Sequence, residues 1–405
     1  MRADAGRFAA ELAALDATAL SSYSLGASDS DVDRALGAEH LDPRHVAALL
    51  SPAAAARLEE LATVASQRTL QRFGRAVRLF APLYVSNECL STCTYCGFAK
   101  DLDVIRLTLT PDGIEAEARL LADRGFRHLL LVSGEHRVAV SPDYLIEVVR
   151  RVAAVVPSVS VETQTWSDDT YARLVAAGAE GVVHYQETYD RTRYAEVHVA
   201  GWKRDFDRRL GSTERAAHAG IRRLGIGALL GLAGDWRADV LAVAAHASYL
   251  GRTYWRTDVT ISLPRIKACA SGFQPVLPVD DASYVQALCA LRLAAPDAGI
   301  VLSTREPAAL RDGLVRIAVT HMSAASSTEP GGYSHPGESQ EQFAISDERS
   351  LAEVAAMLTA AGYEPVWKDS FPLLDGQVDG QGKANRRLAV SAANDGSELV
   401  DASAY

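Results

Sequence analysis

Short apolar, β-rich runs alternate with segments that carry helix signals from about residue 79 onward. This alternation constrains the fold more strongly than any other feature of the sequence. Strands that alternate with helices form parallel sheets, and eight such units close a (β/α)8 barrel. The sequence therefore predicts an α/β protein with a TIM-type barrel. The expected strands are residues 82–86, 128–133, 159–163, 181–186, 226–231, 258–262, 299–303 and 316–320.

The segments between these runs begin with N-cap residues and end at glycine, as helices do. In a barrel of this type, active-site residues lie at the carboxyl ends of the strands and in the loops that follow them. Polar clusters do follow the first, second, third, fourth and seventh expected strands. We expect helix starts at Thr110, Ser141, Ser167 and Ser212 or Thr213, and helix ends at Gly125, Gly178 and near Gly225.

Three parts of the chain are expected from these signals. Residues 1–75 read as an N-terminal helical extension, because apolar residues recur there at helical spacing after Ser51-Pro52. Residues 76–335 form the barrel. Residues 336–405 comprise a helix, with Ser346 as its cap and Gly362 as its end, and then a loose tail rich in small and polar residues.

Three of the five cysteines lie within eight residues, directly after the first expected strand. An odd number of cysteines in a 405-residue chain does not indicate a disulfide framework. Cys89, Cys93 and Cys96 form a CxxxCxxC motif, which can hold three irons of a [4Fe–4S] cluster and leave the fourth iron open. The alternatives are buried structural cysteines, or a structural zinc site that would need a fourth Cys or His.

Charge and hydropathy exclude several classes of partner. The net charge is −10, whereas nucleic-acid and anionic-membrane surfaces need a basic excess. No apolar run approaches the roughly 18 residues of a transmembrane helix. The N-terminus lacks the order of a signal peptide. We therefore expect a cytoplasmic protein without a nucleic-acid or membrane partner.

The cysteine spacing, with Tyr95 directly before Cys96, resembles the radical S-adenosylmethionine (SAM) superfamily. This resemblance implies that SAM binds the open iron and is cleaved to methionine and a 5′-deoxyadenosyl radical. Longer motifs closely resemble the 2-iminoacetate synthases, the tyrosine lyases of thiamine biosynthesis. These motifs are residues 83–98, 128–136, 181–194, 226–232, 263–269, 302–306, 323–333 and 365–369.

The second resemblance implies cleavage of the Cα–Cβ bond of L-tyrosine to 2-iminoacetate and p-cresol. The deoxyadenosyl radical would take a hydrogen from the substrate's amino group, and fragmentation would release a cresyl radical. The implied protein partners are thiazole synthase, which would receive the unstable iminoacetate, and a reductant such as flavodoxin or ferredoxin.

The cofactor SAM carries an ammonium, a carboxylate and a ribose that need polar partners. With Gly134 beside it, Glu135 matches the superfamily's glycine–glutamate motif for the amino group, and Glu162 could accept hydrogen bonds from the ribose. Related enzymes place an arginine near Arg204 for the carboxylate, although Lys203 could substitute. Residues 225–227, with Ile226, would form an apolar shelf by the adenine. Read alone, the glutamates are ordinary loop charges and Arg204 belongs to an exposed charged run.

The amino-acid substrate presents a carboxylate, which favours a bidentate arginine. Arg305 follows the seventh expected strand and is our candidate, the alternative being a rim salt bridge with Glu306. Ser303 could orient the amino group. Tyr185 and Gln186, at the end of the fourth strand, could line the phenol side or assist proton transfer, although barrel packing explains them nearly as well.

Departures from the family pattern leave other functions open. His184 replaces an expected apolar residue, and Thr165-Trp166 replaces a Pro-containing stretch. If either faces the cavity, the substrate could be tryptophan or a modified aromatic amino acid of natural-product synthesis. The related lyase of hydrogenase assembly needs a second cluster near its C-terminus, but no cysteine follows Cys289, which we expect in the core. Cys269 has no assigned role, and a non-catalytic metal-binding scaffold is the remaining alternative.

Overall fold

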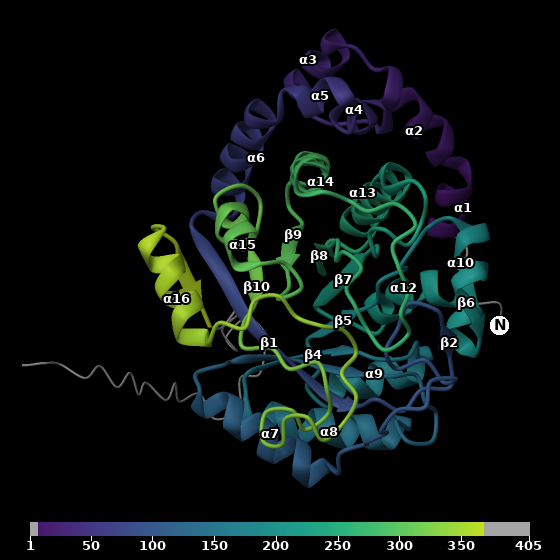
Figure 1. Cartoon of the computed structure of the whole chain (residues 1–405), viewed down its shortest axis with the longest axis vertical. Coiled ribbons are helices and arrows are strands. Elements are labelled where there is room, and N and C mark those ends of the chain that lie inside the picture. Colours follow the sequence, from purple (N-terminus) through teal and green to yellow (C-terminus); the bar gives the residue numbers. More distant parts are fainter. Residues whose placement is uncertain (1–6, 368–405) are drawn as a thin grey trace, which may run out of the picture. The chain divides into compact units, whose positions relative to one another are not determined.

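The computed structural model describes residues 7–367, and a closed barrel of eight parallel strands lies at its centre (Figure 1). The strands follow one another around the barrel in chain order, which confirms the predicted fold class. The expected loose tail lies outside the described residues. The barrel strands are β1 Ala76–Ser86, β3 His128–Ser133, β4 Ser158–Glu162, β5 Gly181–Val183, β7 Arg223–Gly227, β8 Asp258–Ser262, β9 Gly299–Leu302 and β10 His321–Ser323.

The long strand β1 closes the barrel. It pairs with β3 along its second half, with Leu83 opposite Leu131, and with β10 along its first half, with Arg78 opposite His321. The strand β11 (Glu364–Val366), which was not predicted, adds to the start of β1. Because every pairing in this sheet is parallel, all carboxyl ends of the barrel strands open on one side, the mouth of the barrel.

Helices cover the outside of the barrel, and their predicted caps are largely confirmed. Thr110, Ser141 and Ser167 each accept a backbone N–H of the first turn. One end is wrong: α12 ends at His218, while Gly225 lies in β7. These helices are α7 Pro111–Asp123, α8 Pro142–Val155, α9 Asp168–Ala176, α10 Arg191–Val197, α11 Phe206–Leu210, α12 Ser212–His218, α13 Trp236–Thr253, α14 Asp281–Ala294, α15 Ala308–Val315 and α16 Leu351–Ala360.

The eighth strand was predicted wrongly at residues 316–320. The carbonyl of Leu314 accepts the N–H groups of Ile317, Ala318 and Val319, so this apolar run ends helix α15 instead of pairing in the sheet. Sheet pairing begins only at β10, a three-residue strand that starts with a buried histidine and therefore lacks a clear strand pattern.

The helix after the barrel begins later than expected. Its N-cap is Ser350, which forms a capping box with Glu353. Ser346, the expected cap, lies in the preceding loop and donates its N–H to the carbonyl of Thr304.

The helical N-terminal extension is present and packs on α13 and α14. Gln286 of α14 donates to the carbonyls of Leu49 and Ser51, and Phe8 stacks on His246 of α13 with 4.0 Å between ring centroids. Within residues 7–367, no helix has both the length and the apolar character needed to cross a bilayer. The extension comprises α1 Arg7–Ala14, α2 Ala17–Gly26, α3 Asp29–Gly37, α4 Pro43–Leu49, α5 Pro52–Ala56 and α6 Leu58–Phe73.

Candidate functional site

A cavity opens at the mouth of the barrel, and its empty space together with the open solvent at its entrance is about 1370 Å³. The cysteine loop forms one wall, and strand ends and the loops after them form the others. Most residues that the sequence singled out for chemistry lie here. The predicted residues lining the cavity are Cys89, Cys93, Tyr95, Cys96, Gly134, Glu135, Glu162, Tyr185, Ser303 and Arg305.

The cysteine loop is held in place by hydrogen bonds that leave its thiols facing the cavity. Its short strand β2 (Thr92–Cys93) pairs with β6 (His198–Ala200), which belongs to the segment after β5. Arg106 donates to four backbone carbonyls, those of Asn87, Phe98, Ala99 and Leu102. The loop is therefore held in shape by Arg106 together with backbone pairing to a distant segment.

Burial makes the charged form of the three thiols costly unless a cation binds them. Burial raises the pKa of Cys89 to about 11, with Cys96 and Glu135 adding to the shift, and burial also raises the pKa of Cys93 and of Cys96. Thiolates here need a bound cation to offset their charge. Within the described part of the chain, no three His, Cys, Asp or Glu side chains converge on a single ion. A [4Fe–4S] cluster fits, since each thiolate binds a different iron.

Gly134 allows the end of β3 to lie directly against the cysteine loop. A Cβ at this position would overlap the carbonyl oxygen of Glu88 and approach Cys89 Cβ to 3.1 Å. The next residue, Glu135, accepts hydrogen bonds from Ser91 Oγ at 3.2 Å and from Arg209 Nη1 at 3.1 Å. Glu135 is thereby fixed beside the thiols, as the glycine–glutamate motif predicts.

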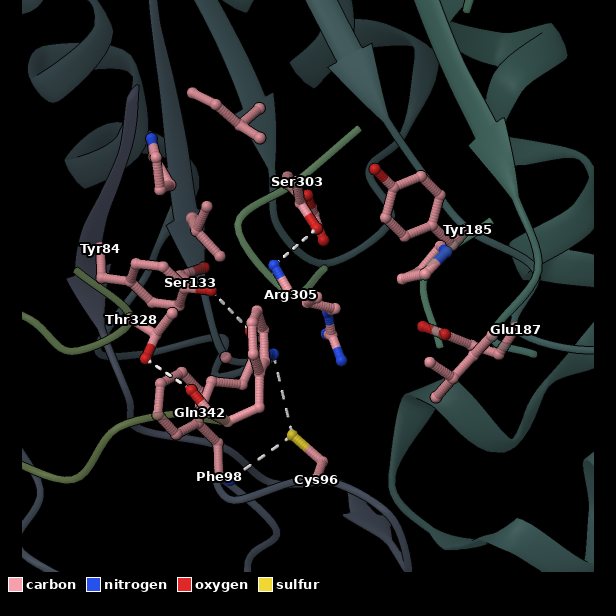
Figure 2. A pocket seen from close by; sticks show the side chains of 18 of the residues that line it. Tyr84, Cys96, Phe98, Ser133, Tyr185, Glu187, Ser303, Arg305, Thr328 and Gln342 are labelled. Atoms are coloured by element: carbon pink, nitrogen blue, oxygen red, sulfur yellow. Dashed lines mark hydrogen bonds between the residues drawn. The ribbon is translucent and has the colours of Figure 1, made fainter. Parts of the chain in front are cut away.

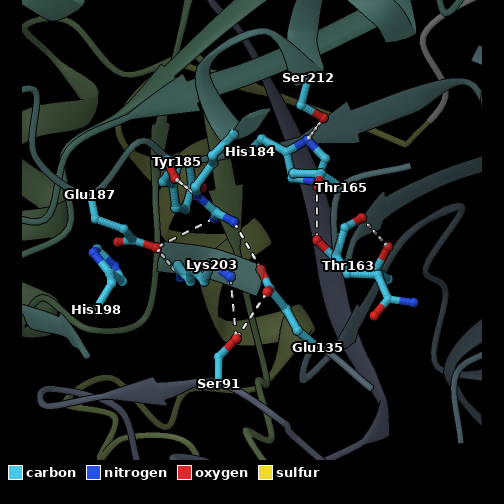
Figure 3. Close-up of polar contacts among 12 residues, drawn as sticks. Ser91, Glu135, Thr163, Thr165, His184, Tyr185, Glu187, His198, Lys203 and Ser212 are labelled. Carbon is cyan, nitrogen blue, oxygen red and sulfur yellow. Dashed lines mark hydrogen bonds and ion pairs between the residues drawn. The ribbon is translucent and has the colours of Figure 1, made fainter. Parts of the chain in front are cut away.

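A second carboxylate, Glu187, joins this group through two cations (Figure 3). Lys203 Nζ lies 2.7 Å and Arg209 Nη2 3.6 Å from Glu187 Oε1. Burial opposes ionisation of Glu187, but the two cations outweigh it and lower its pKa. Glu187 has a φ of 71°, a strained conformation for a residue with a Cβ. The strain and the paired charges are typical of a functional site.

Glu162 ends β4 and also lines the cavity. Burial, with the nearby charge of Glu187, raises the pKa of Glu162 to about 7. Such a carboxyl group gains stability from hydrogen-bond donors that a ligand brings, for example ribose hydroxyls. Tyr185 also lines the cavity, and desolvation of its hydroxyl raises its pKa far above the usual range.

Arg305 extends into the cavity from the loop after β9, with Ser303 beside it (Figure 2). Its guanidinium carbon lies 3.3 Å from the centre of the Phe343 ring. Glu306, the predicted alternative partner of Arg305, instead forms its ion pair with Arg265. The structure thus leaves the Arg305 guanidinium directed at the cavity, where a ligand carboxylate can reach it.

A loop after β10 covers part of the mouth and contacts the cysteine loop. Gln342 accepts the N–H of Gly97 at its carbonyl, 3.2 Å away, and its Nε2 lies 3.8 Å from Cys96 Sγ (Figure 2). Its Oε1 accepts the hydroxyl of Tyr84 at 2.7 Å. The cavity is therefore completed by residues beyond 335, the position where sequence signals predicted the barrel to end.

Three predicted residues lie outside this cavity. Arg204 is exposed in the short helix η1 (Trp202–Arg204), whereas Lys203 and Arg209 line the cavity. Gln186 is buried behind the wall and donates to the carbonyl of Phe206. Ile226 lies deeper in the barrel, in a smaller cavity of about 420 Å³. The structure does not bring these three side chains to the thiols.

The two departures from the family pattern do not face the cavity either. His184 bonds Ser212 Oγ at 2.8 Å and the carbonyl of Thr163 at 3.0 Å, inside the protein. The indole N–H of Trp166 donates to Thr163 Oγ1 at 3.0 Å. Cys289 is buried in the core, and Cys269 Sγ lies 3.4 Å from the carbonyl oxygen of Tyr95.

Sequence reasoning placed Glu187 in the polar cluster after the fourth strand but gave it no role, and it did not assign Arg209 or Gln342 to the site. Arg209 belongs to a charged run that reads as an exposed face, yet it is 6% exposed. Arg209 lies three residues after Phe206 and one before Leu210, and these three residues share the buried side of α11. This helical spacing was the available signal that Arg209 is buried. Gln342 has no such signal because its place depends on contacts distant in sequence.

Comparisons with known families agree with this geometry. Residues 83–246 match the radical SAM superfamily, and residues 262–364 match the biotin and thiamin synthesis associated domain. The first match contains the cysteine loop, Glu135, Glu162 and the Glu187 group. The second contains Ser303, Arg305 and the loop that covers the mouth.

Individual proteins resemble the chain over most of its length. It is 42% identical to 2-iminoacetate synthase of Escherichia coli K12, over 90% of this chain and 94% of that protein. It is also 42% identical to the synthase of Salmonella typhimurium, over 85% and 91%. A crystal structure of HydG, a maturase of the [FeFe]-hydrogenase, superposes with a TM-score of 0.81 at 29% identity, covering 87% of this chain and 79% of HydG.

Proposed function

The chain belongs to the 2-iminoacetate synthase family of radical SAM enzymes, and we propose on that premise that it cleaves the Cα–Cβ bond of L-tyrosine. The products are 2-iminoacetate and p-cresol. One observation supports this assignment most directly. The three thiols of the cysteine loop, Ser303 and Arg305 all line a single cavity. Such a cavity can keep a radical source and an amino acid together, away from solvent.

The enzyme uses a [4Fe–4S] cluster and SAM, which when bound supply a 5′-deoxyadenosyl radical. Cys89, Cys93 and Cys96 hold the cluster. Glu135 would accept hydrogen bonds from the SAM ammonium in addition to those it accepts from Ser91 and Arg209. Glu162 accepts bonds from the ribose hydroxyls.

The SAM carboxylate needs a cation, and the cavity offers Lys203 and Arg209. Both already neutralise Glu187, so an incoming carboxylate meets cations that are fixed in position. The exposed position of Arg204 favours these two residues for the role. The ring of Tyr95 packs against Lys203, with 5.7 Å between the ring centre and Lys203 Nζ.

For the substrate, Arg305 binds the tyrosine carboxylate and Ser303 orients the amino group. Tyr185 lies on the wall nearest the deeper cavity and limits where the phenol can lie. Tyrosine is favoured over tryptophan because neither His184 nor Trp166, the two departures from the family pattern, faces the cavity.

Two protein partners follow from the chemistry. Cluster reduction needs a one-electron donor such as flavodoxin or ferredoxin. The imine product hydrolyses in water, so a thiazole synthase that receives it directly is the second partner.

Anaerobic reconstitution with iron and sulfide, followed by incubation with SAM, a reductant and each aromatic amino acid, tests the assignment. We expect 5′-deoxyadenosine, p-cresol and glyoxylate, the hydrolysis product of 2-iminoacetate, from tyrosine. Mass spectrometry measures all three. Deoxyadenosine without p-cresol from tyrosine, together with a cleavage product from tryptophan, contradicts the proposed substrate.

A further inference from the structure

An exposed tryptophan lies between two arginines beside the cysteine loop. The guanidinium carbons of Arg137 and Arg208 lie 3.4 Å and 4.3 Å from the centre of the Trp202 ring, which is 37% exposed. Arg204 and Asp205 complete a shallow groove around this ring. We call these five residues the Trp202 surface. The function proposed above gives this stack no role.

This surface is attached directly to the loop that carries the cluster ligands. Gly201 lies so close to the loop that a Cβ would stand 2.5 Å from Ser91 Cα. On the other side of Trp202, the N–H of Lys203 donates to Ser91 Oγ at 3.4 Å. Ser91 is two residues from Cys89, and Leu90 between them is exposed. The Trp202 surface is therefore a rigid outer face of the cluster-binding loop.

The charge of this surface is opposite to that of the whole protein. It combines three arginines with one carboxylate, that of Asp205, in a chain with a net charge of −10. The nearby carboxylate of Asp207 is paired with Arg191 at 2.6 Å. Val138, next to Arg137, is 81% exposed and adds an apolar contact. Arginine and tryptophan around an apolar centre are the residues that dominate binding energy in protein interfaces.

We propose that the Trp202 surface docks a small acidic protein that delivers one electron to the cluster. Charge complementarity selects the partner: an acidic carrier is repelled by most of this chain and attracted here. One electron leaves the carrier and enters the oxidised cluster, and no covalent bond forms or breaks in this step. The inference rests on the proposed function, because only a cluster that must be reduced needs such a partner.

Charge reversal at Arg137 tests the inference, and the chain offers a matched control. Arg256 also lies over an exposed tryptophan, Trp255, at 5.0 Å, but just before β8 and thus at the opposite end of the barrel. With oxidised flavodoxin as the probe, calorimetry measures its affinity for the holoenzyme. We expect Arg137→Glu to weaken binding about ten-fold or more at low salt and Arg256→Glu to leave it unchanged.

A second readout separates docking from the reaction itself. Deoxyadenosine formation driven by reduced flavodoxin should fall in Arg137→Glu, whereas formation driven by dithionite should match the wild type. Arg137→Lys, which keeps the charge, should restore most of the flavodoxin-driven rate. If tyrosine is not the substrate, the affinity and SAM-cleavage readouts still report on docking.

Three outcomes overturn the inference. The first is equal flavodoxin affinity in Arg137→Glu and the wild type. The second is equal weakening in Arg137→Glu and Arg256→Glu, which indicates a nonspecific charge effect. The third is retained flavodoxin-driven turnover in Arg137→Glu with a loss of transfer to thiazole synthase, which would assign the surface to the protein that accepts the product. Arg208→Glu repeats the test if Arg137→Glu does not fold.

Discussion

The two ends of the barrel use polar and titratable residues in different ways. At the mouth, Glu135, Glu162 and Arg305 face a cavity open to ligands. At the floor, near the amino ends of the strands, polar side chains satisfy one another inside the protein. His128 bonds Ser160 Oγ at 3.0 Å, and His321 bonds Thr320 Oγ1 at 2.9 Å.

The floor also keeps its histidines neutral. Burial, reinforced by the nearby Arg223 and Arg78, holds the pKa of His128 and of His321 well below the usual range. At the mouth the opposite shift occurs, since burial raises the pKa of Glu162 to about 7. Burial shifts pKa values at both ends. At the mouth, the shifted carboxyl group of Glu162 lines the larger cavity, where hydrogen-bond donors of a ligand can reach it. The comparison indicates that the mouth is built for chemistry and the floor for stability.

Removing one thiol from the mouth should have the largest effect. We expect Cys93→Ala to lose the visible absorbance of the cluster and all deoxyadenosine formation, since a cluster bound by two thiolates does not persist. Cys289→Ala, in the core and outside the cavity, should keep both. An intact cluster in Cys93→Ala would refute the ligand assignment.

Arg305→Ala should leave the cluster intact and reduce kcat/KM for tyrosine by about 100-fold or more, because a buried carboxylate loses its charged partner. The absorbance spectrum and p-cresol formation measure the two properties separately. Arg305→Lys should lie between wild type and Arg305→Ala, since it keeps the charge but not the bidentate geometry. Wild-type p-cresol formation in Arg305→Ala would remove this residue from the substrate site.

Glu162→Gln should weaken SAM binding about ten-fold, because a carboxylate that accepts two hydroxyl bonds becomes an amide with one acceptor. Equilibrium dialysis with SAM on the reconstituted protein measures this. The matched control is Glu180→Gln, which changes a carboxylate at the amino end of β5, where it accepts the hydroxyl of Ser158 at 2.7 Å. Equal effects of the two substitutions would contradict the division between mouth and floor.

The sequence predicted the architecture well where local signals decide it. Two barrel strands, β3 and β8, have the predicted bounds, because short apolar runs between caps leave little freedom. The strand β10 was misplaced because the apolar run before it serves to end a helix. A short apolar run has the same pattern whether it forms a strand or ends a helix. Pairing with β1 and β9 shows which residues form the strand.

The site shows the same limit. The cysteine loop, Glu135, Glu162 and Arg305 were predicted because each lies at or just after the carboxyl end of a strand, and the carboxyl ends of parallel strands meet. Which cation of the run 203–209 faces the cavity depends on how the chain turns after β6. The family resemblance favoured Arg204, with Lys203 as the alternative, whereas the fold turns Lys203 and Arg209 inward. Contacts as distant as Gln342 with Gly97 leave no mark in the local sequence.

The smallest expected effect concerns the floor and appears only as a dependence on pH. Unfolded His321 binds a proton below about pH 6.5, whereas folded His321, which faces Arg78, Arg223, His128 and Arg292, does not. Falling pH therefore favours the unfolded state of the wild type. His321→Gln lacks this contribution. The difference between the unfolding free energies of the wild type and of His321→Gln should therefore shrink by up to about 1.4 kcal/mol for each pH unit below 6.5. Urea titrations of the apoprotein at pH 5.0 to 7.5 measure it, and parallel curves would show that the floor does not hold His321 neutral.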